Sequence, residues 1–223
     1  VPRITEDEIM EILYWFLLIS GGFLLGSIMF CELIPKIVLK KDIYKISVDN
    51  NPGAFNAIKH CGKKIGIPCL VLDVSKGFIP VLLASLFIIT ESIAFSFVIV
   101  APALGHAIGL FNRFHGGKCI AVSFGITLGL IPVNWISFVI LASLYIVFSA
   151  VIKINPASKR SVVVYALFFV INCTVLGATG CFFTAIGCGM LSLLPIVKFL
   201  FSKNGMVENT FDCELSDGCE ENK

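Results

Sequence analysis

Charged residues are scarce in this sequence of 223 residues, of which 14% are charged and 57% are hydrophobic. A soluble domain carries about 25% charged residues. This shortage excludes an ordinary soluble globular protein, and we expect an all-α, polytopic integral membrane protein. No nucleic-acid partner is expected.

Paired metal-binding motifs are also lacking. Nine cysteines are present, but they form no Cys-x-x-Cys pair, and the three histidines show no regular spacing. Many of the cysteines lie inside apolar runs, where they serve as small apolar residues rather than as a disulfide or zinc framework. We expect no metal and no cofactor. The start of the sequence has no charged region followed by a small-residue cleavage site, so we also expect no cleavable signal peptide.

Long apolar runs are what the sequence does contain. A membrane-spanning helix needs about 20 apolar residues. The 34 uncharged residues between Lys118 and Lys153 would reach about 51 Å as one helix, so we expect them to fold back near Pro132. The 37 uncharged residues between Arg160 and Lys198 predict a second turn at residues 177–180. About seven spans result, at residues 12–35, 65–90, 92–112, 119–133, 135–152, 161–177 and 180–201 of a single membrane domain 1–202.

The distribution of lysine and arginine predicts the orientation. Basic residues gather in segments 36–64, 113–118 and 153–160, which all lie on one side if seven spans alternate. The positive-inside rule places that side in the cytoplasm. We therefore expect a multi-pass plasma-membrane protein with the N-terminus outside, and a disordered, acidic tail at 203–223 inside.

The stretch from Gly105 to Gly125 is a glycine-rich, basic break between two apolar runs. It contains two histidines, an arginine and Gly116-Gly117-Lys118. Backbone N–H groups and a fixed positive charge are what a phosphate group needs to bind. Asn51, Asn56 and Lys59 offer similar groups in the preceding basic loop. The sequence therefore predicts an anion site at a bilayer surface.

Four polar motifs occur in order along residues 20–130. They are Gly26-Ser27 with Leu33-Ile34 and Lys36; Asn51-x-Gly53-Ala54-x-Asn56; Leu72-Asp73-x-x-Lys76-Gly77 with Pro80; and Gly105-His106 with Phe114-x-Gly116-Gly117-Lys118. In these motifs the chain resembles the bacterial acylphosphate:glycerol-3-phosphate acyltransferases (PlsY type), which are small seven-span membrane enzymes.

The resemblance implies the transfer of a fatty acyl group from acyl phosphate to the 1-hydroxyl of sn-glycerol 3-phosphate, which gives lysophosphatidate and phosphate. It implies a site that faces the cytoplasm. The implied catalytic residues are Lys118 and His106. The implied substrate- or phosphate-binding residues are Ser27, Asp49, Asn51, Gly53, Asn56, Lys59, Gly116, Gly117 and Ser161.

The chain departs from the family pattern at several of these motifs. Val48-Asp49-Asn50 stands where the family has Gly-Ser-Gly, which puts a carboxylate at a position that the resemblance assigns to phosphate. Lys59 replaces an arginine, and Cys119 replaces a glycine. The family's C-terminal His and Asn have no clear counterpart, Asn204 being the nearest candidate.

Other interpretations of these motifs stay open. The lysines at 36–64 also suit a membrane anchor or an anionic-lipid patch, and Asp73 with Lys76 suits a structural ion pair. His106 is equally a structural group. The alternative functions are a catalytically impaired paralogue that binds acyl phosphate or lipid headgroups, and a small anion transporter.

A His-x4-Asp pair, by which many thioester-dependent acyltransferases activate an acceptor hydroxyl, is absent after each of the three histidines, since Ile65, Phe111 and Ile120 stand five residues on. No side chain stands out as a general base. A substrate phosphate is then the expected proton acceptor, with His106 as the alternative.

Overall fold

The computed structural model describes residues 5–87 and 90–200, and all regular structure in these ranges is helical. Thr5 begins the first helix with a capping box, because its side chain accepts the Glu8 N–H while the Glu8 side chain accepts the Thr5 N–H. The helices are α1 (Glu6–Gly26), α2 (Phe30–Leu39), α3 (Ile43–Ile46), α4 (Ala54–Cys61), α5 (Lys63–Phe87), α6 (Ile93–Ile108), the short η1 (Leu110–Asn112), α7 (Ile120–Gly129), α8 (Ile136–Ile146), the π-helical η2 (Val147–Val151), α9 (Ala157–Ala178) and α10 (Phe182–Leu200).

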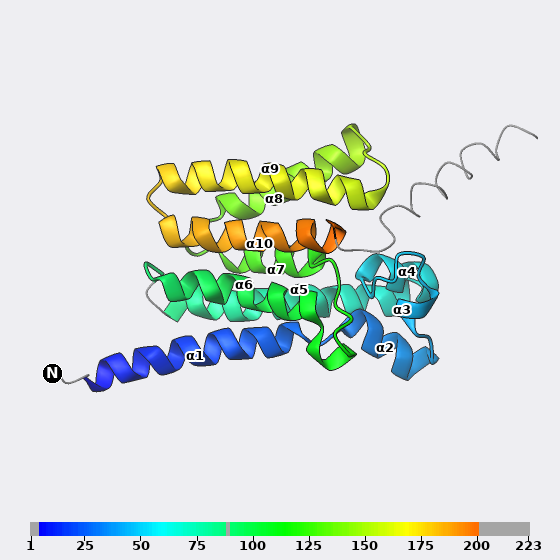
Figure 1. Cartoon of the computed structure of the whole chain (residues 1–223), viewed down its shortest axis with the longest axis horizontal. Helices are drawn as coiled ribbons and strands as arrows, with labels where there is room; N and C mark the ends of the chain where they lie inside the picture. Colours follow the sequence, from blue (N-terminus) through cyan, green and yellow to red (C-terminus); the bar gives the residue numbers. More distant parts are fainter. Residues whose placement is uncertain (1–4, 88–89, 201–223) are drawn as a thin grey trace, which may run out of the picture.

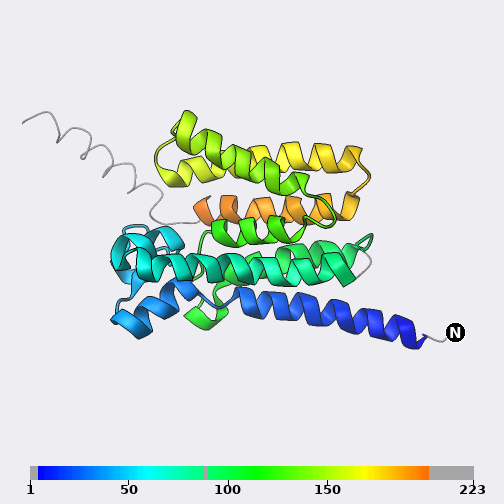
Figure 2. The ribbon, with the colours of Figure 1, turned by 180° about the vertical axis from the view of Figure 1, so that it is seen from behind.

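Within the described ranges, five helical segments are long and apolar enough to cross a membrane: α1, α5, residues 93–112, α9 and α10. They run roughly alongside one another, as both views of the ribbon show (Figures 1 and 2). The multi-pass class is therefore confirmed. Two shorter apolar helices, Ile120–Gly129 and Ile136–Val151, stand where two further spans were expected. Seven spans and their orientation stay predictions.

The first expected span differs from the structure. We expected one helix over residues 12–35, but α1 ends at Gly26, and α2 begins at Phe30 after a short break. The hydropathy of the run is continuous across this break, so composition alone gives no sign of it. The polar groups that hold the break come from α5, which lies far along the chain.

Close helix contacts build the core. A Cβ added at Gly105 of α6 would lie 2.1 Å from the carbonyl oxygen of Phe23, so α1 and α6 approach through their backbones. Helix α5 packs on α7, and α10 packs on both α6 and α9. The buried core includes Phe95, Ile99, Ile126 and Leu191.

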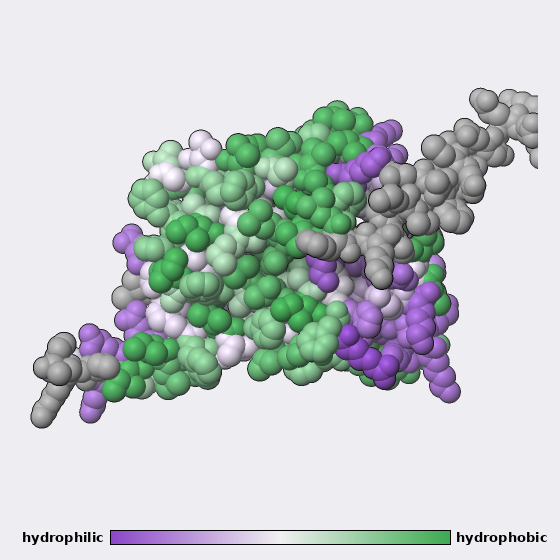
Figure 3. Space-filling model, in the orientation of Figure 1, coloured by the Kyte–Doolittle hydropathy of each residue, from purple (hydrophilic) through white to green (hydrophobic). Residues whose placement is uncertain are grey.

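Polar residues gather at one end of this bundle. Figure 3 shows green, apolar side chains along its flank and purple side chains around the end where α2, α3 and α4 lie. The stretch between α6 and α7 lies at the same end (Figure 1). The tail expected at 203–223 lies outside the described residues. The fold therefore brings the basic segments 36–64, 113–118 and 153–160 to one end of an apolar bundle.

Candidate active site

A cavity of about 790 Å³ lies at the polar end of the bundle. One wall comes from residues 48–60 and from Lys118 and Ile120, and the opposite wall comes from Tyr145 and residues 155–161. The site therefore joins the basic loop before α5 to the start of α9, two segments about a hundred residues apart.

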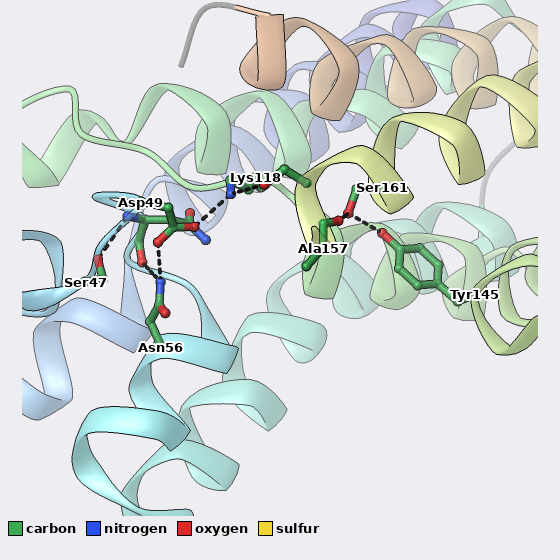
Figure 4. A network of polar contacts seen from close by, with 9 residues as sticks. Ser47, Asp49, Asn56, Lys118, Tyr145, Ala157 and Ser161 are labelled. Atoms are coloured by element: carbon green, nitrogen blue, oxygen red, sulfur yellow. Dashed lines mark hydrogen bonds and ion pairs between the residues drawn. The ribbon is translucent and has the colours of Figure 1, made fainter. Parts of the chain in front are cut away.

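Lys118 lies at the centre of the polar contacts. Its Nζ is 2.7 Å from Asp49 Oδ2 and 3.4 Å from Ser158 Oγ. Asn56 Nδ2 donates to Asp49 Oδ1 at 2.7 Å and to the Asn51 carbonyl at 2.9 Å. Figure 4 shows Lys118 and Asn56 reaching Asp49 from two directions. An ammonium and an amide thus converge on one oxyanion.

The loop that carries Asp49 is held by its own backbone and side chains. Ser47 Oγ accepts the Asn51 N–H at 3.1 Å, and Asn50 adopts a left-handed conformation with φ 45°. Gly53 is the N-cap residue of α4, and a Cβ there would lie 2.7 Å from Asn51 Nδ2. Helix α4 then presents Asn56 and Lys59 toward the cavity.

The loop is further anchored to α2. The Glu32 carboxylate, which is buried, accepts the Tyr44 N–H at 2.9 Å. Burial raises the pKa of Glu32, and the neighbouring Asp42 carboxylate adds to that rise. Burial alone would also raise the pKa of Asp42, but the Lys45 N–H and the ammonium groups of Lys45 and Lys36 hold it below its usual value.

Positive charge lines both walls of the cavity. Lys59 stands on α4, and Arg160 stands in the first turn of α9. Among the described residues, Arg160 Nε is buried without a hydrogen-bond partner. With Lys118, three cationic side chains line the cavity beside one carboxylate, Asp49.

The start of α9 and the end of α8 close the other side of the cavity. Tyr145 donates from its hydroxyl to Ser161 Oγ at 3.3 Å, and Ser161 donates to the Ala157 carbonyl at 3.0 Å (Figure 4). The Tyr145 ring packs against Phe124 and Tyr165 below it. Tyr145 and Ser161 line the cavity, whereas Tyr165 belongs to the buried apolar core.

The glycine pair positions Lys118 rather than lining the cavity. The Gly117 N–H donates to the His106 carbonyl at 3.0 Å, and a Cβ at Gly117 would lie 2.4 Å from His106 Nε2. A Cβ at Gly116 would lie 2.1 Å from the Ala107 carbonyl oxygen. The loop therefore lies flat on the end of α6, which fixes the backbone next to Lys118.

The structure thus brings together six of the residues that the sequence suggested. Asp49, Asn51, Asn56, Lys59, Lys118 and Ser161 line one cavity. His106 does not line it; the residue is buried, and its Nδ1 has no partner in the described part of the chain. Ser27 is fully buried and donates to the Phe23 carbonyl, so it too lies off the cavity wall.

Sequence reasoning missed several wall residues, namely His60, Tyr145, Ser158 and Arg160. The basic segment 153–160 indicated only membrane orientation. The one sequence signal for a role in the site was its position as the last basic segment before an apolar run. The sequence does not indicate which residues lie across the cavity from it. In residues 5–87 and 90–200, no three His, Cys, Asp or Glu side chains are placed to hold a metal ion.

Comparisons with known proteins agree with the fold and with the resemblance that the sequence carries. The family model described as glycerol-3-phosphate acyltransferase matches residues 16–204. A glycerol-3-phosphate acyltransferase of Maridesulfovibrio salexigens is 34% identical over 181 residues, which cover 81% of this chain and 87% of that protein. One of Thermotoga petrophila is 40% identical over 112 residues, which cover 50% of this chain and 56% of that protein.

A solved structure is similar over most of the chain. It is described as PlsY (YgiH), an integral membrane glycerol 3-phosphate acyltransferase, in its glycerol 3-phosphate form. The likeness has a TM-score of 0.71 and 27% sequence identity, and it covers 87% of this chain and 92% of the other.

Proposed function

The chain belongs to the glycerol-3-phosphate acyltransferase family, and we propose that its cavity transfers an acyl group from acyl phosphate to the 1-hydroxyl of sn-glycerol 3-phosphate. The supporting observation is the convergence of Lys118 and Asn56 on one oxyanion position, with Lys59 and Arg160 on the facing walls. Both proposed substrates carry a phosphate. Cations at the polar end of an apolar bundle suit a phosphate headgroup whose acyl chain stays in the lipid.

The proposed reaction balances within the two substrates. The glycerol 1-hydroxyl oxygen bonds to the acyl carbon, the bond from that carbon to the phosphate oxygen breaks, and inorganic phosphate leaves. Lysine and arginine side chains held beside the developing negative charge stabilise the transition state, since preorganised donors cost little reorganisation. The Lys118 ammonium is the group that we assign to this role.

The hydroxyl proton passes to a phosphate oxygen of a substrate in this proposal. His106, the alternative acceptor, is 3% exposed and lies beneath Gly117 rather than on the cavity wall. A general base needs hydrogen-bond reach to the proton that it takes. The absence of a His-x4-Asp pair in the full sequence also favours an activated donor whose leaving group is phosphate.

Purified protein in detergent, given acyl phosphate and labelled sn-glycerol 3-phosphate, tests the reaction. We expect labelled lysophosphatidate and one phosphate per acyl group transferred, and no comparable rate with purified acyl-CoA. Equal rates from acyl-CoA, with phosphate contamination excluded, would contradict the donor and leave the acyltransferase class standing. Binding of both acyl phosphate and sn-glycerol 3-phosphate without formation of any product would indicate a catalytically impaired paralogue.

We infer that the protein lies in the plasma membrane and that its cavity faces the cytoplasm. The support is the gathering of basic segments 36–64, 113–118 and 153–160 at the end that carries the cavity, which the positive-inside rule favours for the cytoplasmic side. Single cysteines replacing Lys45 or His115, in a cysteine-free background, test it. If an impermeant thiol reagent added outside intact cells labels either cysteine, the inferred orientation is wrong and the cavity faces the outside.

A further inference from the structure

Asp49 occupies a position in the cavity where a substrate anion would be expected. Its Oδ2 accepts from Lys118 Nζ at 2.7 Å, and its Oδ1 accepts from Asn56 Nδ2 at 2.7 Å. Asp49 comes from the loop between α3 and α4, and Lys118 comes from the stretch before α7 (Figure 4). The carboxylate therefore joins two segments that are 69 residues apart in the sequence.

The contacts that hold this carboxylate are those that hold a phosphate oxygen. An ammonium supplies a point charge and rotatable donors, and an amide supplies two further donors. Asn56 Nδ2 already donates to Asp49 and to the Asn51 carbonyl, so no hydrogen of that group remains for a third acceptor. A phosphate that binds Asn56 has to displace one of these two acceptors, and a phosphate that binds Lys118 approaches an ammonium that already holds the Asp49 carboxylate.

The surroundings make this exchange feasible. The Lys118 side chain is 18% exposed and that of Asp49 is 15% exposed, so the pair borders the open cavity instead of the closed core. If the Asp49 carboxylate stayed bound to Lys118, it would repel a phosphate dianion placed beside it, because charges a few ångströms apart interact strongly when partly desolvated. Asp49 and the phosphate therefore compete for one cation.

We propose that Asp49 is an internal counter-anion of Lys118, which a substrate phosphate displaces. The carboxylate keeps Lys118 and Asn56 in place before substrate arrives, and it weakens phosphate binding by competing for them. This inference rests on the proposed function, since it takes the phosphate of glycerol 3-phosphate as the competing anion. Asp49 is then an affinity-determining residue and not a catalytic one.

The first test is the affinity of purified, full-length protein for sn-glycerol 3-phosphate, measured by calorimetry without an acyl donor. We expect Asp49→Asn and Asp49→Ser each to lower the Kd about tenfold, because one negative charge leaves the cavity. The matched control is Asp42→Asn, which removes the same charge from the same basic segment outside the cavity and should leave the Kd unchanged.

A double-substitution cycle makes the test specific to Lys118. In a Lys118→Ala background, Asp49→Asn should tighten binding clearly less than in wild type, because the shared ammonium is gone and only relief of the repulsion between carboxylate and phosphate remains. In turnover assays, Asp49→Asn should lower the KM for glycerol 3-phosphate and keep kcat within about threefold of wild type, as expected when the ground state and the transition state are bound more tightly by the same amount.

Three results would overturn the inference. One is a Kd that is unchanged or raised in both Asp49 variants. Another is a fall of kcat by about a hundredfold at constant Kd, which is the effect of losing a general base. The third is failure of both variants to fold in detergent, which would make the ion pair structural.

The affinity measurements test the role of Asp49 separately from the proposed acyl-transfer reaction. If the wild type transfers no acyl group from any donor while Asp49→Asn still tightens binding of glycerol 3-phosphate, the reaction is wrong and the counter-anion stands. If turnover occurs and affinity does not respond to Asp49, the counter-anion is wrong and the reaction stands.

Discussion

Two lysine–aspartate pairs with nearly equal geometry lie in different regions of this protein. Asp73 and Lys76 are three residues apart on α5, with 2.8 Å between Nζ and Oδ1, and both side chains are 1% exposed. Asp49 and Lys118 are 69 residues apart, with 2.7 Å between Nζ and Oδ2, and are 15% and 18% exposed. Contact distance therefore does not distinguish their roles, whereas surroundings do.

The α5 pair is buried against residues that connect α1 to α2. Lys76 also donates to the Ile28 carbonyl and lies 5.6 Å from the centre of the Phe30 ring, and Cys31 donates to Asp73 Oδ2. All three partners belong to the break between α1 and α2 or to the first turn of α2. This pair holds the broken helix together, while the cavity pair has a free side where a ligand can enter.

The largest expected effect comes from breaking the α5 pair. Lys76→Met leaves the Asp73 carboxylate buried without its counter-charge, which costs about 3–5 kcal/mol of stability. Denaturation in detergent measures the loss. Lys45→Met, which removes an exposed lysine, is the control, and Asp73→Asn combined with Lys76→Met should recover most of the loss. A stable Lys76→Met protein would show that the pair does not hold the break.

Breaking the cavity pair should move activity instead of stability. Lys118→Ala should lower kcat by about 10²–10³-fold, as when a preorganised electrostatic group is removed, and lower stability by only about 1 kcal/mol because Asp49 faces the cavity. Steady-state kinetics and thermal unfolding in the same detergent measure both. The control is Lys63→Ala, an exposed lysine off the cavity wall. Wild-type turnover in Lys118→Ala would place the site elsewhere.

A smaller effect is expected where the loop before α7 lies on α6. Gly117→Ala places a methyl group 2.4 Å from His106 Nε2, which shifts the backbone next to Lys118 and lowers kcat about tenfold. Gly177→Ala is the matched control, since a Cβ there meets nothing within 4 Å. Equal activity of the two variants would show that the packing of Gly117 does not position Lys118.

The smallest effect is expected at Asp42, which forms two ion pairs with exposed lysines. Asp42 Oδ2 lies 3.9 Å from Lys36 Nζ and 3.6 Å from Lys45 Nζ. The Lys36 and Lys45 side chains are 59% and 77% exposed. Asp42→Asn should cost less than about 1 kcal/mol at pH 7. The lowered pKa of Asp42 means that its contribution is present above the unfolded-state pKa and is lost as pH falls through the folded-state value. Wild type and variant should therefore converge in stability as pH falls through the folded-state pKa of Asp42, and a difference that grows at low pH would contradict this sign.

The sequence alone determined the class of the protein and much of one cavity wall. Long uncharged runs separated by basic segments require a membrane bundle, because hydropathy is a local property of consecutive residues. The motif around Asn51 and Asn56 and the glycine pair before Lys118 carried the resemblance that the comparisons confirm. Each of these signals lies within a few neighbouring residues.

Tertiary structure alone decided which charged groups face one another. In the folded protein the first expected span ends at Gly26, and His106 lies off the cavity wall. Arg160 and Tyr145 lie across the cavity from α4. Tertiary structure also joined Asp49 to Lys118 across 69 residues and enclosed Asp73 and Lys76. The reason is physical: the energy of an ion pair depends on the distance and desolvation that helix packing imposes, and neither quantity is encoded in the neighbouring sequence.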